Sequence, residues 1–164
     1  MSHAEGDETK ALEYAAHAEG ECTVAKGEGS HAEGCWTIAS EWGAHAEGAD
    51  TIASEYGSHA EGSETRALEF AAHAEGSCNV ALDFADHAEG STTVAAGGAS
   101  HAEGDCSVTL GYASHAENES AAVGDYSHSE GCEAIAVGDY SHAEGEGFTT
   151  YVGNEIVKIS RYVY

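Results

Sequence analysis

Every histidine of this chain is followed two residues later by a glutamate, and the pair recurs along nearly the whole sequence. The 11 histidines lie 14 residues apart, except for an interval of 13 residues between His115 and His128. Alanine separates the members of most pairs and glycine follows them, with Ser129 and Asn118 as the exceptions. Imidazole and carboxylate groups are ligands of divalent metals, and they also form hydrogen bonds and ion pairs with each other. The pattern therefore indicates either a metal-binding column or a structural one.

The repeat provides one such pair per unit, and no unit is set apart from the others. Because a metal site depends on a local grouping of ligands, we expect a structural ladder of hydrogen bonds or ion pairs between coils or chains, with no metal, cofactor or catalytic residue. We also expect the nearby carboxylates to raise the histidine pKa above its ordinary value of about 6.5. The predicted ladder consists of His17, Glu19, His31, Glu33, His45, Glu47, His59, Glu61, His73, Glu75, His87, Glu89, His101 and Glu103.

The residues around each pair alternate between small and larger side chains, which is the period of a β-strand. Around His31, for example, the small set consists of Ser30, Ala32, Thr37 and Ala39. Glycines and variable residues separate the two halves of the unit, as expected for turns. Each 14-residue unit thus predicts one coil of a β-solenoid, with two short strands and two turns. The small side chains should lie inside, because such a coil is narrow, and the His, Glu, Val, Ile and Leu side chains outside.

An interior of alanine, serine and threonine buries little apolar area. The aliphatic residues outside would form a stripe that soluble monomers rarely expose, so we expect an oligomer that covers it. Aromatic residues that precede successive histidines by two or three positions should stack along the rod. They are Tyr14, Trp42, Tyr56, Phe70, Phe84, Tyr112, Tyr126 and Tyr140.

The 14-residue period with its small-x-Ala-x-Gly segments resembles the head repeats of trimeric autotransporter adhesins. The Ser-His-Ala-Glu-Gly segment resembles the related repeats of bacteriophage tail-fibre and receptor-binding proteins. The resemblance covers residues 2–145. It implies an all-β, left-handed parallel β-roll, with three chains around one axis acting as a stalk or a binding head. It also implies an axis-facing strand like the segments at 120–124 and 134–138, Ser-Ala-Ala-Val-Gly and Ala-Ile-Ala-Val-Gly.

Two arrangements of such an assembly stay open. In the first, the histidine–glutamate strand contacts a neighbouring chain, and the aliphatic strand lies against the next subunit or at a rim. In the second, the aliphatic strand faces the axis, and the histidines and glutamates lie outside. We favour the first, because the pair barely varies along the chain whereas a solvent-facing column should drift.

The composition argues against several classes of function. A formal net charge of −25 argues against a nucleic-acid partner, since binding phosphates needs a basic surface. No apolar run is long enough for membrane insertion. Adjacent serine and histidine residues point to opposite faces of a strand and form no nucleophilic pair, so we expect no enzyme.

The cysteines follow the His-Ala-Glu-Gly segments, in predicted turns. Their odd number and wide spacing predict free thiols instead of a disulfide framework or a zinc knuckle. Free thiols suit folding in a reducing cytosol, which favours a phage protein over an exported adhesin. The expected location is a virion or an extracellular or cell surface. The cysteines are Cys22, Cys35, Cys78, Cys106 and Cys132.

We expect residues 1–145 to form the β-roll, with a local change near Asn118, and residues 146–164 to form a C-terminal cap or docking segment. The favoured function is a non-enzymatic fibre module that assembles as a rigid homotrimer, with a host-surface receptor or other fibre and virion proteins as further partners. A filament of subunits stacked head to tail is the first alternative. A metal- or ice-binding solenoid is the second, although the threonine column from Thr9 to Thr65 should be interior and thus hidden from ice.

Overall fold

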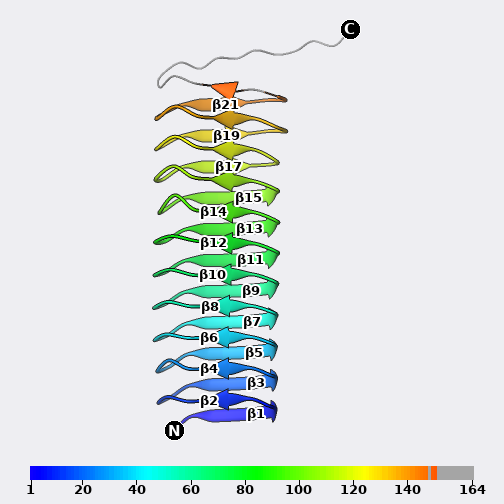
Figure 1. Ribbon diagram of the computed structural model, residues 1–164, viewed down its shortest axis with the longest axis vertical. Coiled ribbons are helices and arrows are strands. Elements are labelled where there is room, and N and C mark those ends of the chain that lie inside the picture. Colours follow the sequence, from blue (N-terminus) through cyan, green and yellow to red (C-terminus); the bar gives the residue numbers. More distant parts are fainter. Residues whose placement is uncertain (148, 151–164) are drawn as a thin grey trace.

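The computed structural model describes residues 1–147 and 149–150. These residues form a rod of stacked coils, in which each repeat of the sequence makes one coil (Figure 1). The prediction of an all-β parallel β-solenoid with 14-residue coils is confirmed. Within the described ranges, no helix is long and apolar enough to cross a membrane.

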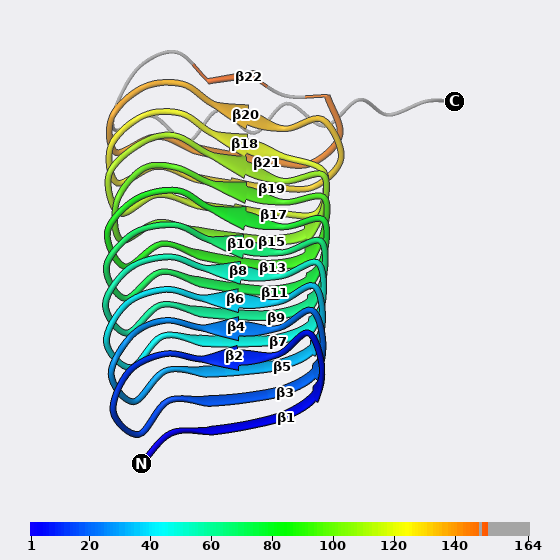
Figure 2. The same cartoon turned by 60° about the horizontal axis from the view of Figure 1, so that its bottom comes forward.

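Two parallel sheets of 11 strands each run the length of the rod (Figure 2). Strands pair in register, so that each residue lies beside its counterpart in the next coil, as His31 lies beside His45. The histidine sheet contains β1 (His3–Asp7), β3 (His17–Glu21), β5 (His31–Cys35), β7 (His45–Ala49), β9 (His59–Ser63), β11 (His73–Ser77), β13 (His87–Ser91), β15 (His101–Asp105), β17 (His115–Glu117), β19 (His128–Glu130) and β21 (His142–Glu144). The aliphatic sheet contains β2 (Lys10–Ala11), β4 (Val24–Ala25), β6 (Ile38–Ala39), β8 (Ile52–Ala53), β10 (Arg66–Ala67), β12 (Val80–Ala81), β14 (Val94–Ala95), β16 (Val108–Thr109), β18 (Ala121–Ala122), β20 (Ile135–Ala136) and β22 (Thr149–Thr150).

The glycine of each His-Ala-Glu-Gly segment is required by the close approach of neighbouring coils. Gly62 has a φ of +113°, and a Cβ atom on it would meet the carbonyl oxygen of Gly76 at 2.0 Å. Asn118 stands at this position in the coil that lacks one residue, with a φ of 59°. There the strand β17 has 3 residues, whereas β15 before it has 5. The predicted change in the roll near Asn118 is therefore confirmed.

A second left-handed position lies in the turn before each histidine strand. Glycine occupies it at Gly43 and Gly57, and alanine occupies it at Ala71 and Ala85, with φ between 52° and 64°. No atom lies within 4 Å of a Cβ built on Gly57. These turns therefore require a backbone conformation, but they leave room for a side chain.

Small side chains fill the interior, as predicted. In the strands of both sheets, every inward-facing alanine from Ala18 to Ala143 is fully buried. The serine hydroxyls bond locally, as where Ser30 Oγ donates to the Gly27 carbonyl at 2.7 Å. The threonine column is interior, which removes the flat exposed face that ice binding needs. Its fully buried members include Thr23, Thr37, Thr51 and Thr65.

Two larger polar residues interrupt this interior. Asn79 replaces a threonine, and its amide donates hydrogen bonds to the carbonyls of Glu75 and Gly90 at 2.5 and 2.8 Å. Asp86 replaces a serine or alanine, and its carboxylate accepts hydrogen bonds from the backbone N–H and the hydroxyl of Ser100, both at 2.9 Å. Both side chains are fully buried and hydrogen-bonded, so they add polar ties between coils at positions where most other coils have threonine, serine or alanine.

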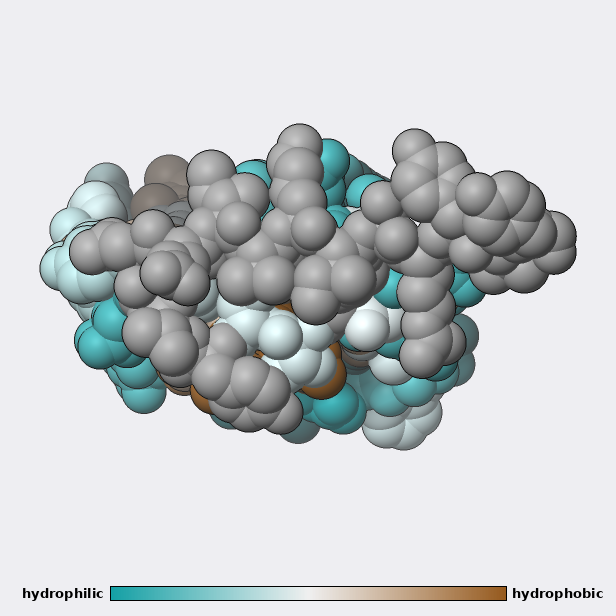
Figure 3. Space-filling model, turned by 90° about the horizontal axis from the view of Figure 1, so that it is seen from above, coloured by the Kyte–Doolittle hydropathy of each residue, from teal (hydrophilic) through white to brown (hydrophobic). Residues whose placement is uncertain are grey.

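The outward position of the aliphatic sheet forms a mostly half-buried column of chiefly aliphatic residues, which the exposed Arg66 interrupts. Leucines beside this aliphatic column are more exposed, up to 59% at Leu12. Viewed along the rod, hydrophilic side chains lie around much of its margin (Figure 3). The predicted apolar stripe is thus present on one sheet. The aliphatic column consists of Val24, Ile38, Ile52, Arg66, Val80, Val94, Val108, Ala121 and Ile135.

Aromatic rings stack in the turns, as predicted for most of them. One stack joins Trp42, Tyr56, Phe70 and Phe84, with ring centroids 4.6 to 5.6 Å apart. A second joins Tyr112, Tyr126 and Tyr140, the first pair edge to face. Gly98 takes the aromatic position in the coil between the two stacks. Glu28 takes it in the coil after Tyr14, so Tyr14 has no ring contact among the described residues. Rings stacked in parallel cover one another's faces, which leaves mainly edges for a ligand.

The described coils extend to Thr150 in β22. Most of the segment predicted as a cap or docking strand, residues 146–164, lies outside the described residues.

The two kinds of left-handed glycine predict different responses to the same substitution. Gly62→Ala should lower the free energy of unfolding by about 3–4 kcal/mol, because the new Cβ meets the backbone of the next coil. Gly57→Ala should cost only about 1–2 kcal/mol, because its cost is the φ value alone. Urea denaturation followed by circular dichroism measures both. Equal losses would contradict the role assigned to the coil-to-coil contact.

Candidate functional site: the histidine–glutamate ladder

The histidine sheet presents its imidazoles and carboxylates on its outer face, because each fully buried alanine between them points inward. The imidazole rings form one uninterrupted stack from His3 to His142, with centroids of successive rings 4.5 to 5.1 Å apart. The stack follows from the register, since each histidine lies beside the histidine of the next coil.

The structure brings together all seven predicted histidine–glutamate pairs within their own coils. The shortest joins His31 Nε2 to Glu33 Oε2 at 3.3 Å, a hydrogen-bond distance. In the other six pairs, the Nε2 to Oε2 distance lies between 3.5 and 3.7 Å. Because the carboxylates are half-exposed, water screens their attraction to the imidazoles. Each pair therefore adds little stability on its own.

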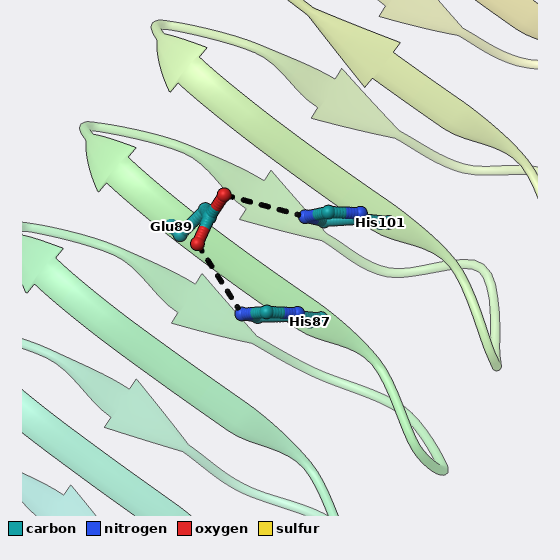
Figure 4. Close-up of side chains that lie close together, drawn as sticks. All are labelled: His87, Glu89 and His101. Atoms are coloured by element: carbon teal, nitrogen blue, oxygen red, sulfur yellow. Dashed lines mark ion pairs between the residues drawn. The ribbon is translucent and has the colours of Figure 1, made fainter.

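The pairing changes from β13 onward. Glu89 lies between two rings, with Oε2 3.7 Å from His87 Nε2 and Oε1 3.8 Å from His101 Nε2 (Figure 4). His128 approaches Glu117 of the preceding coil, with 3.4 Å between Nε2 and Oε1. In this part of the ladder a carboxylate therefore contacts histidines of two coils, or of a coil other than its own. The strict repeat of the sequence contains no sign of this change.

The carboxylates of this region also influence one another. Burial raises the pKa of Glu103, and hydrogen bonds with Glu89 and Glu117 raise it further. The pKa of Glu117 is lowered, first because it accepts a hydrogen bond from Glu130 and then because His128 donates to it. A proton held by one carboxyl group thus stabilises the charge on its neighbour.

The expectation of raised histidine pKa values is wrong for two members of the ladder. The pKa of His73 is lowered, mainly by burial and then by the neighbouring imidazole of His87. The pKa of His101 is lowered by burial and by His87 and His115. Nearby glutamates act in the opposite direction but do not prevail. The expectation rested on the carboxylates alone, whereas the 14-residue register also stacks further imidazoles beside His73 and His101, and these lower the pKa.

Several imidazoles of the ladder have a buried Nε2 atom without a hydrogen-bond partner in the described structure. Such a nitrogen carries either a lone pair or an N–H group. In both cases it has lost its hydrogen bond to water without gaining one from the protein. Such atoms are candidates for an additional ligand. They belong to His59, His73, His87, His101, His115 and His142.

The cysteines are free, as predicted, and lie on the exposed or half-exposed surface. Cys132 Sγ donates to Glu119 Oε2 at 3.0 Å. The pKa of the Cys132 thiol is raised to about 11, first by this hydrogen bond and then by desolvation and the negative charges of Glu119, Glu133 and Glu146. Low thiolate content makes this cysteine slow to react.

No protein-family model matches this chain, and no curated protein is detectably similar to it in sequence.

Acid should weaken the fold through His73 and His101. Their pKa values are lower in the folded chain than the ordinary 6.5, so the unfolded chain binds more protons once the pH falls below that value. Stability is therefore lost as the pH falls through this range, and the loss ends below the folded pKa. The urea midpoint, measured with EDTA present, should fall less between about pH 7.5 and pH 5.5 in a His73→Gln, His101→Gln variant than in the wild type. An equal fall in both proteins would contradict this assignment.

Removal of the Glu119 charge should activate Cys132. A pKa change of two units alters the thiolate fraction a hundredfold, and the lower intrinsic nucleophilicity of a more acidic thiol offsets about half of it on a logarithmic scale. Glu119→Gln should therefore accelerate alkylation of Cys132 by iodoacetamide about tenfold at pH 8, as measured by peptide mass spectrometry. Glu146→Gln, which removes a weaker influence, is the control and should change the rate much less.

Proposed function

We propose that this chain is a non-enzymatic structural module of a fibre, in which three copies associate side by side into a rigid rod. The observation that carries the proposal is the aliphatic column, whose half-exposed valines and isoleucines follow one sheet on both sides of Arg66. Its neighbours include exposed leucines such as Leu82 and Leu110. A surface of this length and composition is typical of an interface.

The energetic balance of a single coil supports association. Its core consists of alanine, serine and threonine, which bury few methylene groups. Covering the outward valines and isoleucines would add about 25 cal/mol for each Å² of apolar surface removed from water. Because a valine or isoleucine recurs in most coils, the gain accumulates along the rod.

The aliphatic sheet, rather than the histidine sheet, is the face that we assign to packing between chains. In β5, His31 and Glu33 form a hydrogen bond within one coil, so this pair needs no second chain. The aliphatic column has no comparable partner among the described residues. This assignment corresponds to the second of the two arrangements left open by the sequence.

The resemblance to adhesin heads and phage tail fibres supports the finer parts of the proposal. These are a left-handed roll, a threefold axis, and a role as stalk or receptor-binding head on a virion or a cell surface. The five free thiols agree with folding in a reducing cytosol before release. A host-surface receptor or other fibre proteins would be the partners at the ends or along the exposed sheet.

The repeat itself supports a structural role instead of an enzymatic one. The neighbours Ser30 and His31 point to opposite sides of their strand, and Ser30 Oγ bonds to the Gly27 carbonyl. The same chemistry recurs in coil after coil, whereas catalysis needs one place at which different groups converge.

Light scattering on a sizing column, in EDTA and reductant, tests the proposal. The wild type should have three times the 16.8 kDa mass of one chain. Val94→Asp, between Val80 and Val108 in the aliphatic column, should shift the mass toward that of the monomer, because it places an unpaired charge in the interface. Ser63→Asp is the control: it adds the same charge on the histidine sheet, in a column that already contains Asp7 and Asp105.

A monomeric wild type, or a trimer unaffected by Val94→Asp, would overturn the proposed packing. Polydisperse particles that grow with concentration would support the head-to-tail filament instead.

A further inference from the structure

We propose that His87, Glu89 and His101 bind one divalent transition-metal ion of the zinc class. The ligands would be Nε2 of each imidazole and a carboxylate oxygen, with water completing the coordination. This inference goes beyond the fibre proposal and does not depend on it.

The geometry of the three side chains fits a shared ion better than a set of hydrogen bonds. The Nε2 atoms of His87 and His101 lie 3.7 and 3.8 Å from opposite oxygens of Glu89, beyond hydrogen-bond distance (Figure 4). One donor atom from each of the three residues can be chosen so that all lie within 4.8 Å of one another. Two ligands of a tetrahedral zinc ion, each about 2.0 Å from the metal, lie roughly 3.3 Å apart. Shifts of a few tenths of an ångström to an ångström in half-buried side chains would therefore close the site.

The two imidazole nitrogens are prepared for a ligand. Nε2 of His87 and Nε2 of His101 are both inaccessible to solvent and without a hydrogen-bond partner. Their rings are the most closely spaced pair in the stack, with centroids 4.5 Å apart, and because their planes are only 5° apart the two rings must tilt toward each other to bind one ion. A metal ion would satisfy both lone pairs at once, and the strongly negative chain favours a cation.

Open space borders the carboxylate ligand. A shallow depression of about 390 Å³ is lined by Glu75, Glu89 and Glu103, by the glycines that follow them and by Asn118, and its lining includes neither His87 nor His101. These carboxylates supply negative charge around the site and could accept hydrogen bonds from metal-bound water.

The buried exceptions to the repeat lie directly behind this site. Asn79 donates to the carbonyl of Gly90, the residue after Glu89. Asp86, the residue before His87, accepts hydrogen bonds from Ser100, the residue before His101. The two interior substitutions therefore tie together the backbone segments that carry all three ligands. This is the local exception that a metal site needs and that the outward residues alone do not reveal.

The ladder toward the N-terminus lacks this arrangement. At His31 the Nε2 atom is already within 3.3 Å of Glu33, in its own coil. The four three-residue groupings with metal-ligand spacing in the described chain all lie between His87 and Glu144. His101 also belongs to the next grouping, with Glu103 and His115. Because Nε2 has one lone pair, His101 can serve only one ion at a time.

Zinc titration of the full chain tests the proposal. The protein should carry no polyhistidine tag, and EDTA treatment followed by dialysis should remove bound metal before calorimetry at about pH 7.5. His101→Gln breaks both groupings that contain this residue, so this variant should bind one zinc ion fewer than the wild type. His45→Gln makes the same change within the stack outside the site, and it should bind as many ions as the wild type. All these proteins keep the five cysteines, so zinc held by thiols cancels in the comparison.

Nitrogen-15 NMR of the imidazoles locates the ions. The resonances of His87 and His101 should shift during the titration, while those of His31 and His45 should not. Equal stoichiometry in the wild type and His101→Gln, the same loss in His45→Gln, or shifts spread evenly along the ladder would each overturn the proposal. Light scattering of the same samples reports the assembly, so a failure of the trimer would be distinguished from a failure of the metal site.

Discussion

The parallel register of successive coils is the constraint on which the rest of this structure depends. Each residue lies beside the residue 14 positions later, so the backbone hydrogen bonds of one coil are completed by the next. At Gly62 the coils approach so closely that a Cβ atom would meet the neighbouring carbonyl oxygen. The same narrow cross-section admits only alanine, serine and threonine over most of the interior. A sequence that repeats these small residues and glycines has few other ways to satisfy its backbone.

The register also places like beside like, and this shapes the chemistry of the outer face. Hydrophobic and aromatic residues gain from such stacking, because valine beside isoleucine or tyrosine beside phenylalanine buries apolar surface. Ionisable residues gain less. Stacked imidazoles disfavour one another's protonation, as at His101, and stacked carboxylates raise the pKa of one member, as at Glu103. At His73 and His101 the lowered pKa favours the neutral imidazole, which is the form that binds metals.

The periodic features of this protein could be predicted from the sequence, because a fixed repeat length indicates stacked coils and an alternation of side chains indicates strands. The short strands, the buried Ala39 column and the aromatic stack follow from the repeat length and the alternation of side chains. The lowered pKa of His73 did not follow, since it depends on burial and on neighbours that only the register supplies. The bridging position of Glu89 between His87 and His101 did not follow either, because the glutamates of all coils occupy the same position in the sequence pattern. The handedness of the roll, the symmetry axis of an assembly and its interface depend on how the coils turn and how chains pack, which residue types alone do not specify.

A strict repeat provides length and stiffness, but it distributes every chemical group evenly, so a localised function has to arise where the repeat is broken. Asn79 and Asp86 break it inside the rod, and Asn118 breaks it at the edge of the histidine sheet. The residues with metal-ligand spacing begin at His87, directly after the interior breaks. Neither Asn79 nor Asp86 is needed to fill the core, because threonine, serine or alanine serves elsewhere. Their buried hydrogen bonds are therefore better explained by what they hold in place than by the packing of the coil itself.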